Sequence, residues 1–165
     1  MIRKLRNDDI EPMMSWMKDT DVTCNLQADF CSFTVEQVQF FIDNSWTEDN
    51  VHFAIVDEND NYVGTISLKN IDKKSKNAEY AIVTAKTAHG KGYAKEATND
   101  ILNYAFNNLE LEKVYLYVSV NNTKANRFYQ KCGFIEEGVF RKHTLINGKL
   151  EDIRWFSMLK EEYNK

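Results

Sequence analysis

The chain has 165 residues, of which 43% are hydrophobic and 13% aromatic, enough apolar material for the core of one domain. Its 21 basic and 25 acidic residues give a formal net charge of −4 and form no basic block, which excludes nucleic acid as the main partner. No uninterrupted apolar run approaches the ~20 residues needed to cross a bilayer, which excludes membrane insertion.

The first predicted elements are a short strand and a helix. The run MIRKLR, residues 1–6, is typical of a strand. Asp8, followed three residues later by Glu11, has the pattern of a capping box and predicts a helix that continues through Met17. The next segment, DTDVTCNLQADFCS at residues 19–32, is mixed in composition and predicts irregular structure.

A second helix is predicted after this segment. Thr34 and Gln37 have the spacing of another capping box, which marks the helix start. Val38, Phe41 and Ile42 then recur at the spacing of one helical face. We therefore expect this helix to pack one apolar face against a core.

The middle of the chain alternates strands with helices. Residues 52–68 are two β-rich runs around a polar turn, which predicts a hairpin, and residues 76–85 predict a further strand. Residues 93–108 carry apolar side chains on one helical face. Residues 113–120 form a strongly apolar strand pattern, and residues 122–132 predict a short helix.

The C-terminal part predicts a second hairpin. Gly133 is a natural residue to end the preceding helix, because glycine adopts the left-handed conformation without steric cost. Residues 134–146 and 151–159 read as two strands. Asn147 and Gly148 between them form a dipeptide that strongly favours a tight hairpin turn.

The order of these elements is β-α-α-β-β-β-α-β-α-β-β. Helices separate some strands while hairpins join others, so we expect a mixed sheet in an α/β (α+β) fold. The prediction is about seven strands and four helices in one domain, residues 1–165, because no linker-like tract or repeat divides the chain.

The cysteines and histidines predict neither disulfides nor a metal site. The three cysteines are Cys24, Cys31 and Cys132, and the three histidines are His52, His89 and His143. The cysteines are odd in number and lack CxxC spacing, no apolar signal segment opens the chain, and no Cys or His pair has metal-ligand spacing. We therefore expect a reduced, cytoplasmic protein without a metal.

The run TAHGKGYAKEA, residues 87–97, places two glycines between a predicted strand and a predicted helix. Gly90 and Gly92 lack the Cβ atoms that would keep a bulky anion away, and the first N–H groups of the helix have no internal partners. The helix dipole adds ~0.3–1 kcal/mol for an anion at this position. A phosphate-binding turn is one interpretation, and a tight turn without a ligand is the other. Tyr93 replaces the Ser/Thr of a P-loop, and the GxGxxG spacing is absent.

A second motif, VSVNNTKANRFYQKCGF at residues 118–134, favours the first interpretation. With the glycine turn and the strand order, it resembles the GNAT superfamily of acyl-CoA N-acyltransferases, in particular its ribosomal-protein and amino-sugar N-acetyltransferase branch. The family turn, Q/R-x-x-G-x-G/A, corresponds to His89, Gly90, Lys91, Gly92, Tyr93 and Ala94, and only His89 departs from it. The signature N-x-x-A-x-x-x-Y-x-K-x-G-F is matched at Asn122, Ala125, Tyr129, Lys131, Gly133 and Phe134.

The resemblance implies that acetyl-CoA lies in a cleft where two neighbouring parallel strands splay apart. The strand backbone at Ile82, Val83 and Thr84 would pair with the pantetheine arm. The turn and helix start would hold the pyrophosphate, mainly through main-chain amides, at His89, Gly90, Lys91, Gly92, Tyr93, Ala94 and Lys95. Asn122 would hydrogen-bond the cofactor from the opposite side.

The resemblance also implies the catalytic residues. Tyr129 would protonate the departing thiolate. Without the motif, Tyr129 would be interpreted as a core aromatic residue. Its neighbour Phe128 is expected to pack in the core. Tyr117 stands where the ribosomal-protein branch has a glutamate, so that base does not carry over. Glu79 is the remaining candidate base, and the alternatives are a solvated sheet-edge glutamate at that position and proton removal by ordered water.

The acceptor is the least determined part of the expected function. Asn25, Gln27 and Asp29 lie in the segment that forms one wall of the acceptor pocket in the family, or else form a surface loop. We expect acetyl transfer to a primary amine of a small molecule, such as a nucleotide amino sugar, by direct attack in a ternary complex. A protein N-terminus is the alternative acceptor, and a non-catalytic acyl-CoA-binding module is the alternative class. The expected assembly is a monomer or homodimer.

Overall fold

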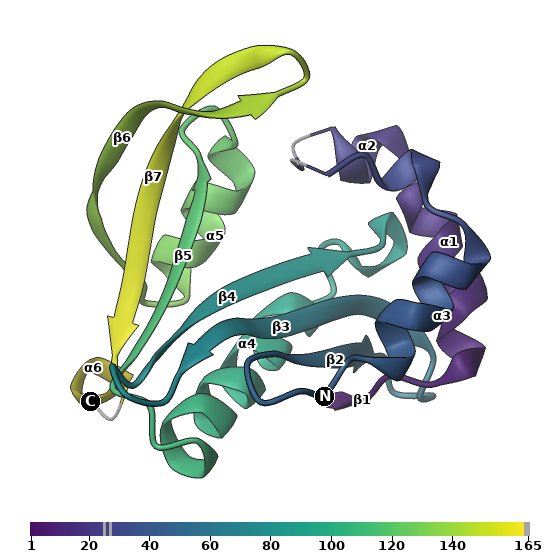
Figure 1. Ribbon diagram of the computed structural model, residues 1–165, viewed down its shortest axis with the longest axis horizontal. Coiled ribbons are helices and arrows are strands. Elements are labelled where there is room, and N and C mark those ends of the chain that lie inside the picture. The colour runs from purple at the N-terminus through teal and green to yellow at the C-terminus, as the bar shows by residue number, and fades with distance from the viewer. Residues whose placement is uncertain (25, 27, 164–165) are drawn as a thin grey trace.

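The computed structural model describes residues 1–24, 26 and 28–163, and within them the strands form one seven-stranded mixed sheet (Figure 1). The strands are β1 (Ile2–Lys4), β2 (Val51–Val56), β3 (Tyr62–Asp72), β4 (Asn77–Thr84), β5 (Lys113–Ser119), β6 (Ile135–Ile146) and β7 (Lys149–Leu159). The α-helices are α1 (Ile10–Met17), α2 (Thr20–Thr23), α3 (Val35–Asp43), α4 (Tyr93–Asn103), α5 (Thr123–Lys131) and α6 (Lys160–Tyr163). The predicted mixed sheet is confirmed, as are four helices of eight or more residues within the described part.

The sheet changes direction at its centre. Its strand order is β1-β2-β3-β4-β5-β7-β6, and β4 and β5 are the one parallel pair among the described strands. Their register covers Asn77 with Lys113, Ala78 with Val114, and Glu79 with Tyr115. Beyond Glu79 the two strands diverge, as Figure 1 shows, so that the sheet opens between them. We call this divergence the splay.

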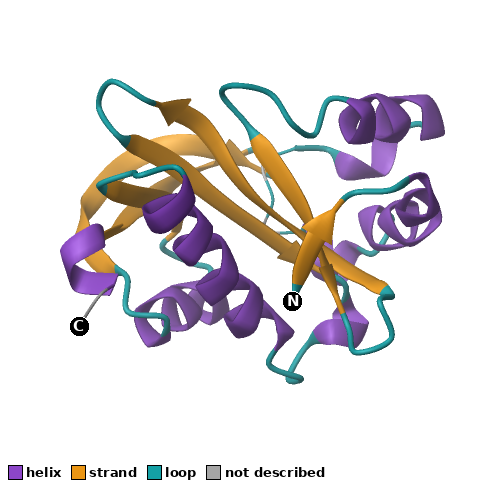
Figure 2. Ribbon diagram, turned by 90° about the horizontal axis from the view of Figure 1, so that it is seen from below, coloured by secondary structure: helices purple, strands orange, loops and turns teal. Residues whose placement is uncertain are grey.

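Helices cover both faces of the sheet and divide the core into two clusters. Figure 2 shows the helices gathered in two groups with the strands running between them. One cluster joins α4 and α5 to the sheet and includes the fully buried Ile101, Phe106 and Phe156. The other joins α1 and α3 to the sheet and includes Met13 and Val38. Alternation along each strand therefore assigns neighbouring side chains to different clusters.

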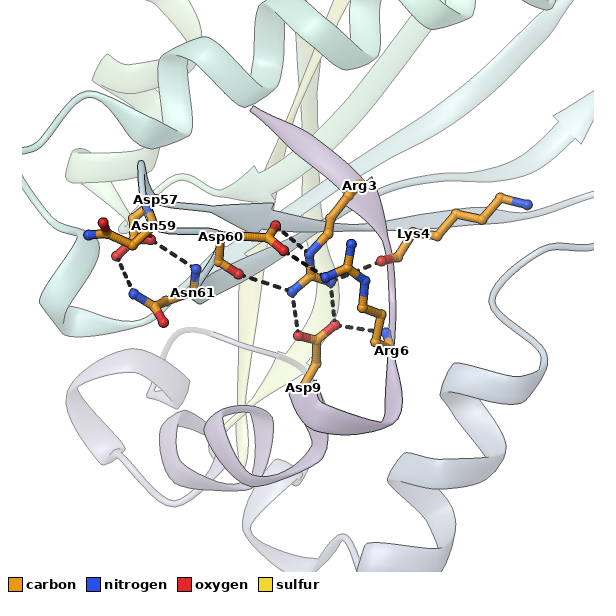
Figure 3. A network of polar contacts seen from close by, with 8 residues as sticks. All are labelled: Arg3, Lys4, Arg6, Asp9, Asp57, Asn59, Asp60 and Asn61. Atoms are coloured by element: carbon orange, nitrogen blue, oxygen red, sulfur yellow. Dashed lines mark hydrogen bonds and ion pairs between the residues drawn. The ribbon is translucent and has the colours of Figure 1, made fainter.

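The predicted start of the first helix is wrong by one residue. A 3₁₀ turn, Asn7–Asp9, precedes α1, and at its start the Asp9 carboxylate accepts from the main-chain N–H of Arg6 at 2.8 Å. The same carboxylate is 2% exposed and receives both terminal nitrogens of Arg3 at 2.8 Å, and Asp60 of the β2–β3 turn binds Arg3 and Arg6 (Figure 3). This network holds the 3₁₀ turn, and Asp9 is the residue before α1, to which its side chain makes no capping bond.

Three other local predictions are confirmed. Thr34 caps α3 through the N–H of Gln37 at 3.3 Å, and the Gln37 side chain accepts from the Thr34 N–H at 2.8 Å, so the second capping box is confirmed. Asn147 and Gly148 have φ values of 48° and 75°, as a tight primed hairpin turn requires. Gly133 follows α5 with φ 91° and ends that helix as predicted.

Two segments differ from their predicted structure. Residues 19–32 contain α2 and a short 3₁₀ turn, Phe30–Ser32, because the Asp19 side chain accepts from the Asp21 N–H at 2.9 Å and starts a helical turn. The predicted helix 93–108 is α-helical only through Asn103 and continues as a π-helical turn, Tyr104–Asn108. In the part of the chain that the structure describes, none of the helices has the length and apolar character of a membrane span.

Candidate active site

The glycine turn connects β4 to α4 and presents main-chain N–H groups. Gly90 and Gly92 have φ values of 79° and 90°, so both occupy the left-handed region that other residues rarely adopt. The N–H groups of Lys95 and Glu96 donate to the Gly92 carbonyl at 2.9 and 3.2 Å. The described residues offer no acceptor to the N–H groups of Gly90, Gly92, Tyr93 and Ala94. The turn therefore has the donors that an anion at a helix start requires.

The turn is held between α2 and α5 by basic side chains. Lys124, in the first turn of α5, places its Nζ 3.1 Å from Nδ1 of His89. Desolvation of His89, together with the charge of Lys124, lowers the pKa of the imidazole, so the ring is a neutral partner for the ammonium. On the other side, Lys86 forms an ion pair with Asp21. His89, the position that departs from the family turn, thus links the turn to the helix that carries Tyr129.

The main chain of β4 is exposed on one edge along the splay. Ile82, Val83 and Thr84 pair with β3 through Ile66, Thr65 and Gly64, while the described register with β5 stops at Glu79. Gly64 makes this approach possible, since a Cβ there would lie 2.5 Å from the Val83 carbonyl oxygen. The edge of residues 82–84 that lies away from β3 offers backbone groups to an extended ligand, as an added strand would, and the Thr84 main chain also bonds the His89 ring.

Tyr129 lies in the core on the α4–α5 side of the sheet. The residue is 9% exposed, and its ring centroid is 6.0 Å from that of Tyr80 and 6.1 Å from those of Phe134 and Phe156. Burial raises the pKa of the phenol well above its usual range, so the hydroxyl keeps its proton at neutral pH. No hydrogen-bond partner for this hydroxyl is present among the described residues. Phe128 packs against the same core, as predicted.

Glu79 occupies the last registered position before the splay. It is 7% exposed, so the interpretation of a solvated sheet-edge glutamate is wrong. One carboxylate oxygen lies 2.6 Å from Nζ of Lys69, and the other accepts from the side-chain amide of Asn70 at 2.8 Å. The charge of Glu79 also acts on the neighbouring strand β5. Burial is the main cause of the raised pKa of Tyr115, and the charge of Glu79 is the second cause. The structure brings Glu79 to the splay, and its role as a base stays a prediction.

Asn122 ends the loop after β5 and begins α5. Its side-chain oxygen accepts from the Ala125 N–H at 3.1 Å, which leaves the amide NH₂ without a partner among the described residues. Asn126, one helical turn on, donates to the carbonyls of Asn122 and Ser119 at 2.7 and 2.9 Å. Arg154 of β7 donates to the Asn126 side-chain oxygen at 3.0 Å. Asn126 and Arg154 were not predicted as site residues, although the Asn-x-x-x-Asn helical spacing was visible.

The predicted acceptor wall is only partly described. Asn25 and Gln27 lie outside the described residues, and Asp29 is exposed just before the 3₁₀ turn Phe30–Ser32. Next to Asp29, the Phe30 ring lies 5.3 Å from Trp16 and 5.4 Å from Phe33, an aromatic group between α1 and α3. The described residues contain no group of three His, Cys, Asp or Glu that could hold a metal ion.

The arms on either side of the splay meet at their tips. The side chain of Asn147, in the β6–β7 turn, donates to the main-chain carbonyl of Cys24 at 2.7 Å. Figure 1 shows the β6–β7 hairpin reaching toward α2 across the opening of the sheet. The unpaired edge of β4 and Glu79 lie along this opening, the glycine turn follows β4, and Tyr129 packs against Tyr80 of β4 on the α4–α5 face.

Comparisons with known proteins agree with this arrangement. The family described as acetyltransferase (GNAT) domain matches residues 1–135. The spermidine N(1)-acetyltransferase of Vibrio cholerae serotype O1 is 36% identical over 122 residues, 73% of this chain and 70% of that protein. A putative ribosomal N-acetyltransferase of Bacillus subtilis is 37% identical over 100 residues, 61% of this chain and 55% of that protein.

The fold was also compared with solved structures. A crystal structure of spermidine N-acetyltransferase from Vibrio cholerae, in complex with CoA and spermine, superimposes with a TM-score of 0.90 at 26% sequence identity. The superposition covers 100% of this chain and 98% of that chain. The opened sheet and its flanking helices therefore have the same arrangement in both proteins.

Proposed function

The chain belongs to the GNAT acetyltransferase family and is an acetyl-CoA-dependent N-acetyltransferase, and we propose that its acceptor is a small aliphatic amine, with polyamines preferred. The observation that carries this proposal is the splay, which combines free main-chain donors at one end with Tyr129 and Glu79 at the other. We reject the alternative of a non-catalytic acyl-CoA-binding module, because the acetyltransferase family model matches most of the chain.

The residues present fit a coenzyme A group. The partnerless N–H groups at Gly90, Gly92, Tyr93 and Ala94 suit a diphosphate, and Lys91 and Lys95 add positive charge beside them. His89 contributes through its position in the turn, while its side chain contacts Lys124. The free edge of Ile82, Val83 and Thr84 suits the amides of a pantetheine arm, and the unpaired NH₂ of Asn122 suits a carbonyl on the opposite side.

The chain's own residues handle the protons of the transfer. When bound, acetyl-CoA supplies the thioester carbonyl that the amine attacks directly in a ternary complex. Tyr129 keeps its proton at neutral pH and donates it to the departing sulfur. Glu79, held by Lys69 and Asn70, accepts the proton of the amine, either directly or through water.

The acceptor proposal rests on charge and on the similar proteins. A chain with a net charge of −4 favours cationic acceptors. The Vibrio cholerae relatives carry spermidine in their names, which favours a polyamine over the nucleotide amino sugar expected from the sequence. Because the chain is also similar to the putative ribosomal N-acetyltransferase of Bacillus subtilis, a protein N-terminus is the second candidate acceptor.

A thiol-release assay tests the proposal. The protein is incubated with acetyl-CoA and, in parallel, with spermidine, butylamine, a nucleotide amino sugar, a short peptide with a free N-terminus, or no acceptor. We expect coenzyme A release above the no-acceptor rate with spermidine and butylamine, and an acetylated amine by mass spectrometry. Release with the sugar or the peptide alone would contradict the small-amine acceptor, and release with none would contradict the proposed function.

A further inference from the structure

The two donors on Glu79 come from consecutive residues, which a regular strand does not allow. Neighbouring side chains on a strand point to opposite faces, yet Lys69 and Asn70 both contact the Glu79 carboxylate, at 2.6 and 2.8 Å. The register between β3 and β4 shifts after Lys69, and Asn70 has a φ of 50° in the left-handed region. This bulge turns Asn70 back toward Glu79. The local backbone is thus shaped to hold one carboxylate from two sides.

The Lys69–Glu79 pair lies on the acceptor side of the splay. On β4, Glu79 alternates with Ala78 and Tyr80, whose side chains belong to the α4–α5 cluster. Val83, which shares the face of Glu79, packs in the cluster with α1 and α3. Lys69 also acts on His52. Burial is the main cause of the lowered pKa of His52, and the charge of Lys69 is the second cause. The pair therefore lies on the side where the family places the acceptor wall.

A carboxylate with a lysine at 2.6 Å presents little net charge to an approaching ammonium group. The same carboxylate without the lysine would attract a cation strongly, because Glu79 is almost completely buried and poorly screened by solvent. Lys69 is itself only about one third exposed in its side chain, so it cannot move freely away from the carboxylate.

From this geometry we propose that Lys69 determines the charge selectivity of the acceptor site, by neutralising Glu79 where β4 and β5 part. The inference rests on the proposed function and specifies it. With Lys69 present, Glu79 itself adds little affinity for the additional ammonium groups of a polyamine. Without Lys69, polyamines gain relative to monoamines of similar length. Lys69 is thus a positioning and selectivity residue that acts through Glu79.

The test compares kcat/KM for spermidine and butylamine in four proteins: wild type, Lys69→Met, Lys69→Arg and Lys73→Met. Lys73 is the control, because its ion pair with Glu48 is exposed on both sides. We expect Lys69→Met to raise the spermidine-to-butylamine ratio about tenfold, as removal of a charge facing a poorly screened carboxylate should. Lys69→Arg and Lys73→Met should keep the wild-type ratio within about twofold.

A purely structural role would lower both rates together and leave the ratio unchanged, and that result in a folded Lys69→Met would overturn the inference. Thermal midpoint and coenzyme A affinity establish that each variant is folded. Should Lys69→Met fail to fold, Lys69→Gln gives the same comparison, since it keeps a hydrogen-bond donor for Glu79 and removes the charge. If the wild type is active and Lys69→Met has the same spermidine-to-butylamine ratio as the wild type, this inference alone is refuted. If the wild type is inactive on every amine, the proposed function is refuted as well.

Discussion

Glu79 and Tyr129 lie on opposite faces of the sheet at the point where β4 and β5 separate. The Tyr129 ring lies 6.0 Å from that of Tyr80, and Tyr80 points away from the face on which its neighbour Glu79 is bound by Lys69. A proton leaving the amine and a proton reaching the sulfur would therefore move on different sides of the opened sheet.

Tyr129→Phe tests the proton donor. We expect kcat to fall by ~10²-fold or more at neutral pH, within the range for loss of a general acid. The variant should remain folded, because the Tyr129 hydroxyl has no hydrogen-bond partner among the described residues. Tyr163→Phe is the matched control, since its hydroxyl donates to the Asn99 carbonyl of α4 at 3.4 Å. An unchanged rate in Tyr129→Phe would remove this residue from the mechanism.

Glu79→Gln tests the base through the pH dependence of the rate. A carboxylate base works only when ionised, so kcat/KM of the wild type should fall toward acid pH, and the variant should be slow without that acidic limb. Glu137→Gln is the control, because Glu137 is also bound by a lysine, Lys113, at 2.6 Å, but lies on β6. If Glu79→Gln keeps the acidic limb of the profile, the base is another group or water.

Gly90→Ala tests the phosphate turn. Alanine at a φ of 79° costs about 1 kcal/mol of folding free energy, and its Cβ would occupy the space where the diphosphate is proposed to bind. We expect the dissociation constant for coenzyme A, measured by calorimetry, to rise about tenfold, which corresponds to about 1.4 kcal/mol. Gly148→Ala has the same backbone strain, with φ 75° in the β6–β7 turn, and should bind coenzyme A normally. Equal affinities in the two variants would show that the turn does not hold the diphosphate.

His52 makes stability depend on pH. Burial and the charge of Lys69 lower the pKa of its imidazole from 6.5 to about 4, and its Nδ1 lies 2.7 Å from the Ser67 hydroxyl. The neutral ring therefore contributes stability above pH 6.5, and this contribution is lost as the pH falls toward about 4. Because the ring is partly exposed, we expect a loss of about 1–2 kcal/mol in unfolding free energy.

Denaturant unfolding at a series of pH values measures this loss. His52→Gln cannot gain a proton and should flatten the profile between pH 6.5 and about 4, whereas the exposed His143→Gln should leave it unchanged. A His52→Gln profile as steep as that of the wild type would assign the acid sensitivity to other groups.

The parts of the fold that depend on local chemistry could be predicted from the sequence. The Thr34–Gln37 capping box and the Asn147–Gly148 turn are properties of a few adjacent residues, and both are present. The 3₁₀ turn before α1 could not be predicted, because its Asp9 is bound by Arg3, which in turn binds Asp60 of a distant turn. Such a tertiary contact leaves no periodic signal in the chain.

The same distinction applies to the site. The glycine turn was visible because glycine is required at the left-handed φ values of 79° and 90°. The bonds that Lys69 and Asn70 make to Glu79 were not visible, because they depend on a bulge that changes which face Asn70 reaches. Sequence reasoning therefore identified Glu79 but not the charge that accompanies it.

A crystal structure of the protein with coenzyme A tests the central claim most directly. We predict diphosphate oxygens within about 3.5 Å of main-chain nitrogens between Gly90 and Lys95, and the pantetheine arm along Ile82–Thr84 in the splay. Coenzyme A bound at another surface, with the β4 edge and the glycine turn left empty, would contradict the account.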